Sequence, residues 1–368
     1  MSKIAFIFPG QGAQVCGMGK DFYEQTEIGR QVYDRASELL GFSMPQLCFE
    51  KNDKLDITEY TQAAMVTTSI AMMKVLMEKG ICPDVTAGLS LGEYCALAAA
   101  GVMSDEDAIT TVRQRGILMQ EAVPVGIGAM AAILALDAAK IEEVISSMKD
   151  VWIANYNCPG QIVISGKKEA VEEACSKLKE AGAKRAIMLN VSGPFHSKML
   201  TEAGEKLGEV LEGVTVHSPR IPYVANVTAS YVTDADQVKP LLVEQVSSSV
   251  RWQQSVETMI ADVPISYVKD ENHDRLNAYL HALSRVISNV KRQPKVNEWI
   301  PIEERLPEEK GLYLVAYHPC YWDNVKEDVL VGIDNFTGKS SWSGRKYQRV
   351  IAWMPLPDPY KVSESTDS

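Results

Sequence analysis

The chain has 368 residues, enough for two or three folding units, and its 46% hydrophobic and 23% charged residues are ordinary for a globular protein. The formal net charge of −11 argues against broad binding to nucleic acid or to an anionic membrane surface. No apolar stretch is long enough to span a bilayer. The N-terminus does not fit a signal peptide, and the seven cysteines are scattered without a Cys-x-x-Cys pair, so we expect a cytoplasmic protein with reduced thiols.

The first elements alternate between strand and helix. Residues 3–8 form an apolar run that predicts a buried strand, and the turn at Pro9–Gln14 leads to a helix expected over 21–40. The glycines of this turn match neither a dinucleotide fingerprint nor a phosphate loop. A stretch rich in Ala and Met, 62–79, predicts a helix in the core, where methionine fills gaps.

The most informative motif is Gly-x-Ser-x-Gly at residues 88–92, which places Ser90 between two glycines. A short apolar strand precedes it and an alanine-rich helix over 93–100 follows, which is the setting of a nucleophile elbow. The start of that helix lies behind Ser90, where its free N–H groups can receive an oxyanion. Catalysis by Ser90 is therefore favoured over a structural serine.

A helix is predicted next over 105–121, with Ser104 as its N-cap. It carries Arg113 and Arg115, which are two positions apart and so cannot share a face. One can face solvent while the other points into the site, although two exposed arginines fit the sequence as well. A guanidinium beside a serine nucleophile needs an anion, and a carboxylate is its natural bidentate partner.

Residues 128–190 predict strand, helix, two strands, helix and strand, the order of a ferredoxin-like unit. Strand and helix patterns resume at 221–226 and 238–246, so this unit is an insertion beside the elbow, and sites often lie in the cleft between two such bodies. The expected segments are 128–136, 138–148, 151–156, 161–165, 168–181 and 184–190.

The last part of the chain has a different composition. The polar and basic stretch at 287–296 indicates a linker, and beyond it Trp, Pro and Tyr are enriched. Strands are predicted at 311–317, 328–333 and 349–353. We expect a small, mainly-β domain there with a disordered tail after it.

An activated serine needs a base. Among the five histidines, His196 is favoured because it leaves the tight turn that ends the inserted unit. No Asp or Glu between Ser90 and His196 has a convincing strand-end setting, so a main-chain carbonyl is expected to orient the ring. Activity should then fall near the ordinary histidine pKa of about 6.5. The acidic cluster 269–274 around His273 suggests a metal site only weakly, because a solvated turn is far commoner.

Together these motifs make the chain resemble the malonyl-CoA:acyl carrier protein transacylase family from residue 4 to about 268. The order and spacing of the matching segments are highly specific. They are Phe8–Gln14, Tyr60–Ala64, Gly88–Tyr94, Arg115–Glu121, Asn155–Gln161, Gly193–His196 and Val250–Trp252.

The resemblance implies an α/β-hydrolase-like body over 1–127 and 191–290, with a ferredoxin-like subdomain over 128–190. A linker at 291–298, a small mainly-β domain at 299–360 and a disordered tail at 361–368 complete the expected organisation. The segments around Trp299–Pro307 and Trp353–Pro357 resemble a small domain family of unknown function.

The same resemblance implies a transfer of malonyl from malonyl-CoA to the phosphopantetheine thiol of acyl carrier protein in fatty-acid synthesis, with no bound cofactor and no metal. Each matching position takes the family's role. Ser90 is the acylated nucleophile and His196 its base, the N–H groups of Gln11 and Leu91 form the oxyanion hole, Arg115 holds the malonyl carboxylate, Asn157 and Phe195 line the pocket, and a carbonyl near 247–249 orients His196.

Three features depart from the family pattern. Leu89 stands where the elbow often has His, residues 269–274 replace a Gly-Pro-Gly-Lys turn, and the chain continues past the usual end near residue 290. Two other functions stay open. A serine esterase or thioesterase would share the elbow, but the absent acid and the Arg115 match speak against it, and a non-catalytic scaffold of the same fold is supported only by Leu89 and the altered turn. Carrier proteins are acidic, so docking to this acidic chain needs local cations, for which Lys184, Arg185, Lys198 and Arg251 are candidates.

Overall fold

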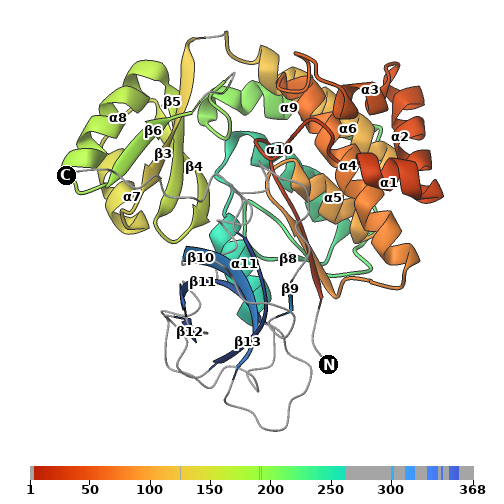
Figure 1. Ribbon diagram of the computed structural model, residues 1–368. Coiled ribbons are helices and arrows are strands. Elements are labelled where there is room, and N and C mark those ends of the chain that lie inside the picture. Colours follow the sequence, from red (N-terminus) through yellow and green to blue (C-terminus); the bar gives the residue numbers. More distant parts are fainter. Residues whose placement is uncertain are drawn as a thin grey trace. The chain divides into compact units, whose positions relative to one another are not determined.

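A computed structural model describes residues 4–124, 126–189, 191 and 193–261, together with the backbone of the strands at 300–301, 311–319, 330–338, 341–342 and 348–355. The chain divides into two compact units, Met1–Lys291 and Arg292–Ser368. The described part of the first unit is a mixed α/β fold with two sheets (Figure 1). The turn at 269–274 and the expected linker and tail at 291–298 and 361–368 lie outside the described residues.

The first sheet has the order β1-β2-β7-β8. Its strands β1 (Ala5–Phe8), β2 (Val85–Gly88) and β7 (Tyr223–Val224) are parallel, and β8 (Tyr231–Val232) pairs antiparallel with β7. All four residues of β2 are buried, as expected for a central strand covered on both faces. The carboxyl ends of β1, β2 and β7 therefore meet at one edge of the sheet.

The N-terminal helices correct one prediction. Residues 21–40, expected as one helix, form α1 (Lys20–Gln25) and α2 (Glu27–Leu40), separated by Thr26. Thr26 has extended backbone angles, and its hydroxyl accepts a hydrogen bond from the N–H of Gly29, so it acts as the N-cap of α2. A short helix that the sequence analysis did not predict, α3 (Met44–Phe49), follows.

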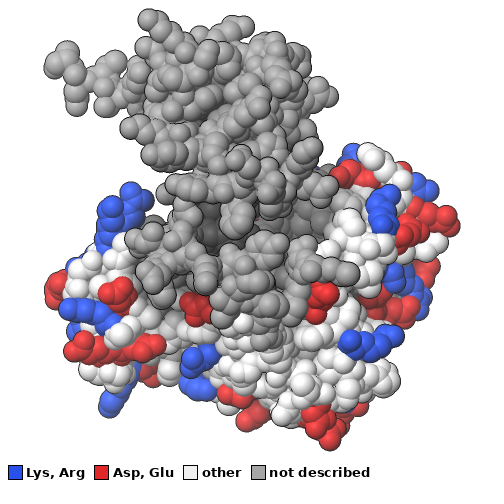
Figure 2. All heavy atoms as spheres, turned by 90° about the horizontal axis from the view of Figure 1, so that it is seen from below, with Lys and Arg blue, Asp and Glu red and all other residues white. Residues whose placement is uncertain are grey.

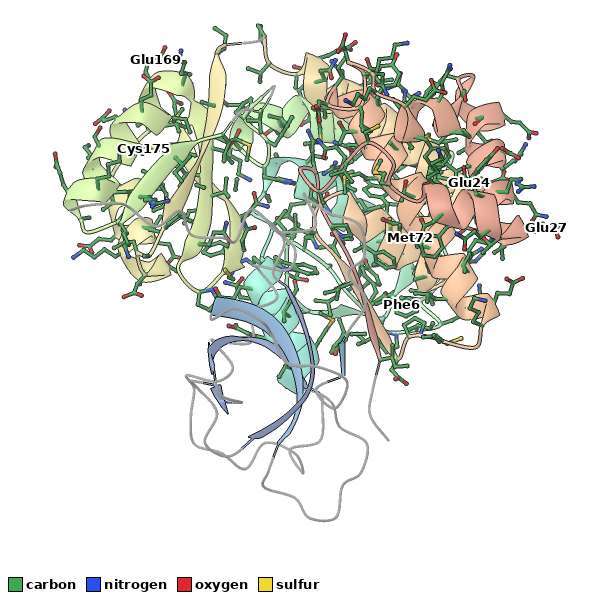
Figure 3. All side chains as sticks on the ribbon, in the orientation of Figure 1. Phe6, Glu24, Glu27, Met72, Glu169 and Cys175 are labelled. Carbon is green, nitrogen blue, oxygen red and sulfur yellow. The ribbon has the colours of Figure 1, made fainter. Side chains whose placement is uncertain are left out.

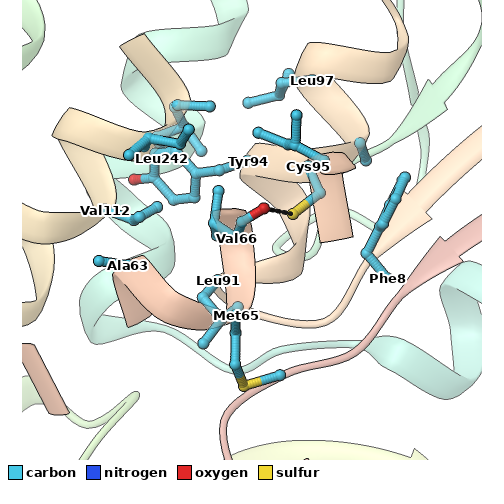
Figure 4. Packing of buried hydrophobic residues seen from close by; sticks show 14 of the residues in the cluster. Phe8, Ala63, Met65, Val66, Leu91, Tyr94, Cys95, Leu97, Val112 and Leu242 are labelled. Atoms are coloured by element: carbon cyan, nitrogen blue, oxygen red, sulfur yellow. Dashed lines mark hydrogen bonds between the residues drawn. The ribbon is translucent and has the colours of Figure 1, made fainter. Parts of the chain in front are cut away.

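The core helices agree with the sequence analysis in type and place. They are α4 (Thr58–Glu78), α5 (Gly92–Ala99) and α6 (Asp105–Glu121). Ser104 caps α6 as predicted, by accepting from the N–H of Asp107 at 3.0 Å. Figure 4 shows the packing around α5, where the buried ring of Tyr94 lies beside Val112 and Leu242.

The second sheet has the order β4-β5-β3-β6 with antiparallel neighbours. Its strands and helices follow one another in the predicted order of strand, helix, two strands, helix and strand. The helices contribute buried side chains such as Cys175, whereas Glu169 on the same helix points outward (Figure 3). The elements are β3 (Gly128–Leu134), α7 (Ala138–Ser146), β4 (Val151–Cys158), β5 (Gln161–Lys167), α8 (Lys168–Glu180) and β6 (Arg185–Met188).

Strand β4 joins the second sheet to the rest of the unit. Its edge pairs with the segment between α10 (Ala235–Ser247) and α11 (Trp252–Ala261). The N–H of Tyr156 donates to Val250 O at 2.9 Å, and the N–H of Val250 donates to Ala154 O at 2.8 Å. The end of α10 is thereby held against the second sheet. The 3₁₀ turn Lys198–Leu200 and α9 (Thr201–Glu212), neither of them predicted, precede β7.

The second unit contains a sheet of order β12-β11-β10-β13-β9 with antiparallel pairing. Its strands β10, β11 and β13 overlap the three that the sequence predicted, and β9 and β12 are short additions. Their bounds are β9 (Ile300–Pro301), β10 (Gly311–Pro319), β11 (Leu330–Gly338), β12 (Ser341–Trp342) and β13 (Gln348–Pro355).

Candidate active site

Ser90 occupies a sharp turn between β2 and α5. Its φ of 54° lies in the left-handed region, which costs a non-glycine residue about 1–3 kcal/mol and is concentrated at functional sites. The glycines on either side are required by space. A Cβ on Gly88 would overlap the backbone of Gly92, and a Cβ on Gly92 would lie 2.5 Å from the carbonyl oxygen of Phe8. The elbow predicted from the motif is present.

Three segments meet at the carboxyl edge of the first sheet. Ser90 follows β2, the loop carrying Gln11 follows β1, and Asn226 follows β7. The N–H of Leu89 donates to Phe8 O at 3.0 Å, which ties the loop after β1 to the elbow. In open sheets with parallel strands, sites form at this edge, where loops from neighbouring strands come together.

His196 reaches Ser90 although the two are 106 positions apart in the sequence. Its Nε2 lies 2.8 Å from Ser90 Oγ, and its Nδ1 lies 2.8 Å from the main-chain oxygen of Gln245. A carbonyl oxygen only accepts, so Nδ1 carries the proton and Nε2 is free to accept the proton of the serine hydroxyl. The orienting carbonyl belongs to Gln245, just before the predicted segment 247–249. No carboxylate hydrogen-bonds this ring among the residues that the structure describes.

The imidazole is held neutral by its surroundings. Burial, and after it the charge of Arg115, lower the pKa of His196 to about 4, while hydrogen bonds to the backbone of Gln245 and Ser248 act in the opposite direction. The ordinary pKa of about 6.5 expected from the sequence is therefore corrected downward. A neutral imidazole is the form that can take a proton from Ser90.

Arg115 is the buried arginine of α6, only 1% exposed. Its Nη2 donates to Ser90 Oγ at 3.0 Å and to Gln245 Oε1 at 2.9 Å, and its Nη1 donates to Gln62 Oε1 at 2.6 Å. Arg113 faces the other way, as the spacing predicted, but it is not left in solvent. It pairs with Glu59 at 2.6 Å and lies over the ring of Tyr60.

The first turn of α5 offers an N–H group beside Ser90. The N–H groups of Gly92, Glu93 and Tyr94 donate to carbonyls three residues earlier. The N–H of Leu91 takes part in none of the hydrogen bonds among the described residues, and neither does that of Gln11. The side chain of Gln11 donates to Thr58 Oγ1 at 3.2 Å, which fastens its loop to the start of α4.

Buried amide and carboxylate groups support this arrangement from behind. Asn226 accepts from the N–H of Ser90 and donates to Gly88 O, both at 2.6 Å. The Nε2 of Gln245 donates to Ser90 O at 3.0 Å and to Glu93 Oε2 at 2.7 Å. The N–H of Asn226 donates to the same carboxylate oxygen at 3.1 Å. The backbone of the elbow is thus held on both sides of Ser90.

A cavity of about 280 Å³ lies in front of His196. One wall comes from β4 and the other from the segment between α10 and α11, so the cavity follows the junction of the two sheets. Asn157 on β4 is half-buried and is outside the set of lining residues, and Phe195 is buried directly beside His196. The lining residues are Trp152, Ile153, His196, Lys198, Val227, Glu244, Ser247, Ser248, Ser249 and Arg251.

Comparisons with known proteins place this site in a family. The model of the acyl transferase domain matches residues 5–317. The chain belongs to the acyl transferase family. A second model, for a protein family of unknown function, matches residues 298–361 at the C-terminus.

Individual relatives agree with the family match. The malonyl CoA-acyl carrier protein transacylase of Bacillus subtilis is 48% identical over 274 residues, which are 73% of this chain and 86% of that protein. The crystal structure of an acyl carrier protein S-malonyltransferase from Vibrio cholerae is 42% identical with a TM-score of 0.69, covering 71% of this chain and 87% of that one. A type II polyketide acyl carrier protein in complex with its malonyl-transacylase matches at 42% identity and a TM-score of 0.68, covering 71% and 86%.

Sequence reasoning about this acyl transferase missed the residues behind the elbow. Gln245 and Asn226 lie 155 and 136 positions from Ser90, and nothing in their local sequence marks them. Glu93 did carry a signal, because it is an acidic residue in an otherwise alanine-rich apolar helix. Gln62 falls within a segment that carried the family resemblance, although its contact with Arg115 was not foreseen.

The cations proposed for docking fall in two places on the acyl transferase unit. Lys198 and Arg251 line the cavity, with Lys198 Nζ 3.4 Å from Ser248 Oγ and the Arg251 guanidinium over the ring of Tyr156. Lys184 and Arg185 lie at the start of β6, on the edge of the second sheet. Figure 2 shows Lys and Arg interspersed with Asp and Glu on the visible face, in keeping with local cation sites on an acidic protein.

The described part of the chain contains neither a candidate membrane span nor a candidate metal cluster. None of its helices combines the length and the apolar character needed to cross a membrane. No group of three or more His, Cys, Asp or Glu residues there could hold a metal ion.

Proposed function

We propose that this chain transfers a malonyl group from malonyl-CoA to the phosphopantetheine thiol of an acyl carrier protein, in fatty-acid synthesis, through an acyl-Ser90 intermediate. One observation carries the proposal. A neutral imidazole and a buried guanidinium both contact Ser90 Oγ, at 2.8 and 3.0 Å. The imidazole supplies the base that acyl transfer needs, and the guanidinium supplies a fixed positive charge where an acidic acyl group would lie.

The first half-reaction acylates the enzyme. His196 Nε2 takes the hydroxyl proton as Ser90 Oγ attacks the carbonyl carbon of the thioester. The C–S bond then breaks, and the departing sulfur of CoA takes the proton from the imidazolium. In the second half-reaction the carrier thiol gives its proton to His196 and attacks the acyl-serine carbonyl. Ser90 leaves with that proton, and the enzyme returns to its starting state.

The developing oxyanion needs donors in each half-reaction. The N–H groups of Leu91 and Gln11 are the proposed pair. Leu91 directly follows Ser90, the loop of Gln11 is tied to the elbow through Phe8 O, and neither N–H has another acceptor among the described residues. One such donor contributes about 2.7–4 kcal/mol to the transition state. The N-terminus of α5 adds its dipole in the same direction.

Arg115 is proposed to hold the malonyl carboxylate. In the free protein its Nη groups donate to the neutral amide oxygens of Gln62 and Gln245. A carboxylate is a stronger acceptor, and a charge-assisted hydrogen bond is worth about 1.5–3 kcal/mol. Phe195 and Asn157 are proposed to bound the acyl pocket. Acetyl groups, which lack this carboxylate, would gain nothing from Arg115.

The domain organisation is part of the same proposal. An α/β-hydrolase-like body formed by 1–127 and 191–290 is supported by the parallel strands that lead to the elbow. A ferredoxin-like subdomain over 128–190 is supported by the strand order β4-β5-β3-β6 and by the two helices that alternate with its strands. A small mainly-β domain at 299–360 forms the C-terminal part.

One assay separates this function from the alternatives. The protein is incubated with malonyl-CoA labelled in the malonyl group, and a holo-carrier protein is then added. Transfer of label to the carrier supports the proposal. Release of free malonate instead would indicate a hydrolase, and no labelling of the protein at all would indicate a non-catalytic scaffold. Ser90→Ala is the control and should take up no label.

A further inference from the structure

Glu93 is a buried acid for which the proposed transfer has no use. It lies on α5 three residues after Ser90 and is only 1% exposed. It makes no direct ion pair within the part of the chain that the structure describes. Burial raises its pKa to about 7. A carboxyl group kept in such a place at this cost calls for a role.

Two hydrogen bonds connect Glu93, through Gln245, to Arg115, the arginine proposed to hold the acyl group. Glu93 Oε2 accepts from Gln245 Nε2 at 2.7 Å, and Gln245 Oε1 accepts from Arg115 Nη2 at 2.9 Å. The same Nη2 lies 3.0 Å from Ser90 Oγ. A continuous line of hydrogen bonds therefore runs from the carboxylate through one amide to the guanidinium and the nucleophile.

The amide in the middle of this line has two ends, and its neighbours decide how it is turned. A carboxylate only accepts hydrogen bonds and a guanidinium only donates them. The Gln245 amide must therefore place its NH₂ toward Glu93 and its oxygen toward Arg115. The same NH₂ also donates to Ser90 O at 3.0 Å, so two close acceptors hold it, and the Glu93 carboxylate is the charged and closer one at 2.7 Å. A group at position 93 that could also donate would compete with the NH₂ of Gln245 and leave Ser90 O as its one secure acceptor. The amide, and with it the acceptor for Arg115, would then be held less firmly.

We infer that Glu93 is a positioning residue for acyl-group selection: its carboxylate fixes the Gln245 amide, and that amide aims the Arg115 guanidinium at the acyl group on Ser90. The inference rests on the proposed role of Arg115. Glu93 touches neither substrate nor the reacting atoms and acts only through Gln245. A change at Glu93 should therefore alter the choice between malonyl and acetyl groups, and not merely the amount of folded protein.

The test compares malonyl-CoA with acetyl-CoA in the full-length protein. The ratio of kcat/KM for the two thioesters is measured for the wild type, Glu93→Gln, Gln245→Met and the double variant. Glu93→Gln keeps the shape and an acceptor oxygen but adds a donor. We expect it to lower the malonyl-to-acetyl ratio about tenfold, the size of effect that contacting residues show in such cycles. Gln245→Met should lower the ratio as well, and adding Glu93→Gln to it should lower the ratio no further, because the amide that Glu93 holds is already gone.

Two controls separate selection from folding. Asp105→Asn removes another partly buried carboxylate, whose ion-pair partner is Lys74 at 2.6 Å and which has no hydrogen bond to Ser90, Gln245 or Arg115 among the described residues. This variant should leave the malonyl-to-acetyl ratio unchanged even if it lowers the melting temperature. If Glu93→Gln does not fold, Gln245→Met tests the same line of hydrogen bonds from its middle. An unchanged ratio in Gln245→Met, or equal falls from Glu93→Gln with and without the Gln245 amide, would overturn the inference.

The outcome is also distinct from a failure of the proposed function. If Arg115→Ala leaves the ratio unchanged, the role of Arg115 fails and the inference fails with it. If Arg115→Ala lowers the ratio while Glu93→Gln and Gln245→Met do not, the proposed function stands and only the role of Glu93 is refuted.

Discussion

The acid limb of the pH profile should lie well below the ordinary range of histidine. His196 is the proposed base, and burial together with the charge of Arg115 lowers its pKa to about 4. Protonation removes the lone pair on Nε2 that accepts the proton of Ser90, so activity falls as pH drops through the pKa of the folded protein. An exposed imidazole would be roughly 90% protonated at a pH of about 5.5 and the rate would fall about tenfold, whereas with a pKa of about 4 only ~3% is protonated.

The assay is kcat/KM for malonyl-CoA, followed by release of the CoA thiol between about pH 4 and 8, because this parameter reports the groups of the free enzyme. Glu93, whose pKa burial raises to about 7, takes up a proton near neutrality, and a protonated Glu93 is expected to weaken the hold of Arg115 on the malonyl group. The profile is therefore measured for the wild type and for Glu93→Gln, which has no such titration. In Glu93→Gln we expect kcat/KM to be nearly flat from neutrality to a pH of about 5 and to fall below that, as the imidazole of His196 takes up its proton.

The reasoning would be refuted by a limb near the ordinary histidine value that persists in Glu93→Gln. Such a result would mean that the ring is reached by water and that its burial beside Arg115 does not set its charge. Circular dichroism over the same pH range shows whether the protein is still folded where activity is lost.

Three further outcomes are expected. Arg115→Ala should narrow the malonyl-to-acetyl ratio of kcat/KM by about 10- to 150-fold, since one charge-assisted contact is worth about 1.5–3 kcal/mol, and an equal loss for both acyl groups would contradict the assigned role. Asn226→Ala should lower the free energy of unfolding in urea by about 2–4 kcal/mol, because it removes two buried hydrogen bonds of 2.6 Å to the elbow; an unchanged midpoint would count against this support. Charge reversal at Lys198 or Arg251 should slow transfer to the carrier protein more than acylation by CoA, and equal slowing of both steps in separate half-reaction assays would remove the cavity mouth as the docking place.

The sequence predicted those parts of the site that depend on local pattern. The two glycines on either side of Ser90, between a strand and a helix, permit the sharp turn of the elbow, so this turn could be predicted from the sequence alone. The two-residue separation of Arg113 and Arg115 likewise meant that only one could face inward. Ser104, a serine ahead of an acidic first turn, was a sufficient signal for the N-cap of α6.

What could not be predicted depends on contacts between distant segments. Asn226 approaches Ser90 because β7 pairs with β2, and Gln245 approaches it because the end of α10 reaches the elbow, and an amide at either position has no local signature. The pKa of His196 follows from burial and from Arg115, neither of which the turn around it reveals. The break at Thr26 shows the same limit on a smaller scale, because the apolar period continues across it while the threonine side chain ends one helix and starts the next.

The central claim is that Ser90 carries the malonyl group between donor and acceptor, and peptide mapping by mass spectrometry tests it most directly. The protein is quenched after brief exposure to malonyl-CoA, digested, and compared with a sample to which the holo-carrier protein was added before quenching. We expect the mass of one malonyl group on the peptide that contains Ser90, and its disappearance once the carrier is present. A modified peptide elsewhere in the chain, or a malonyl group on Ser90 that the carrier does not remove, would contradict the mechanism.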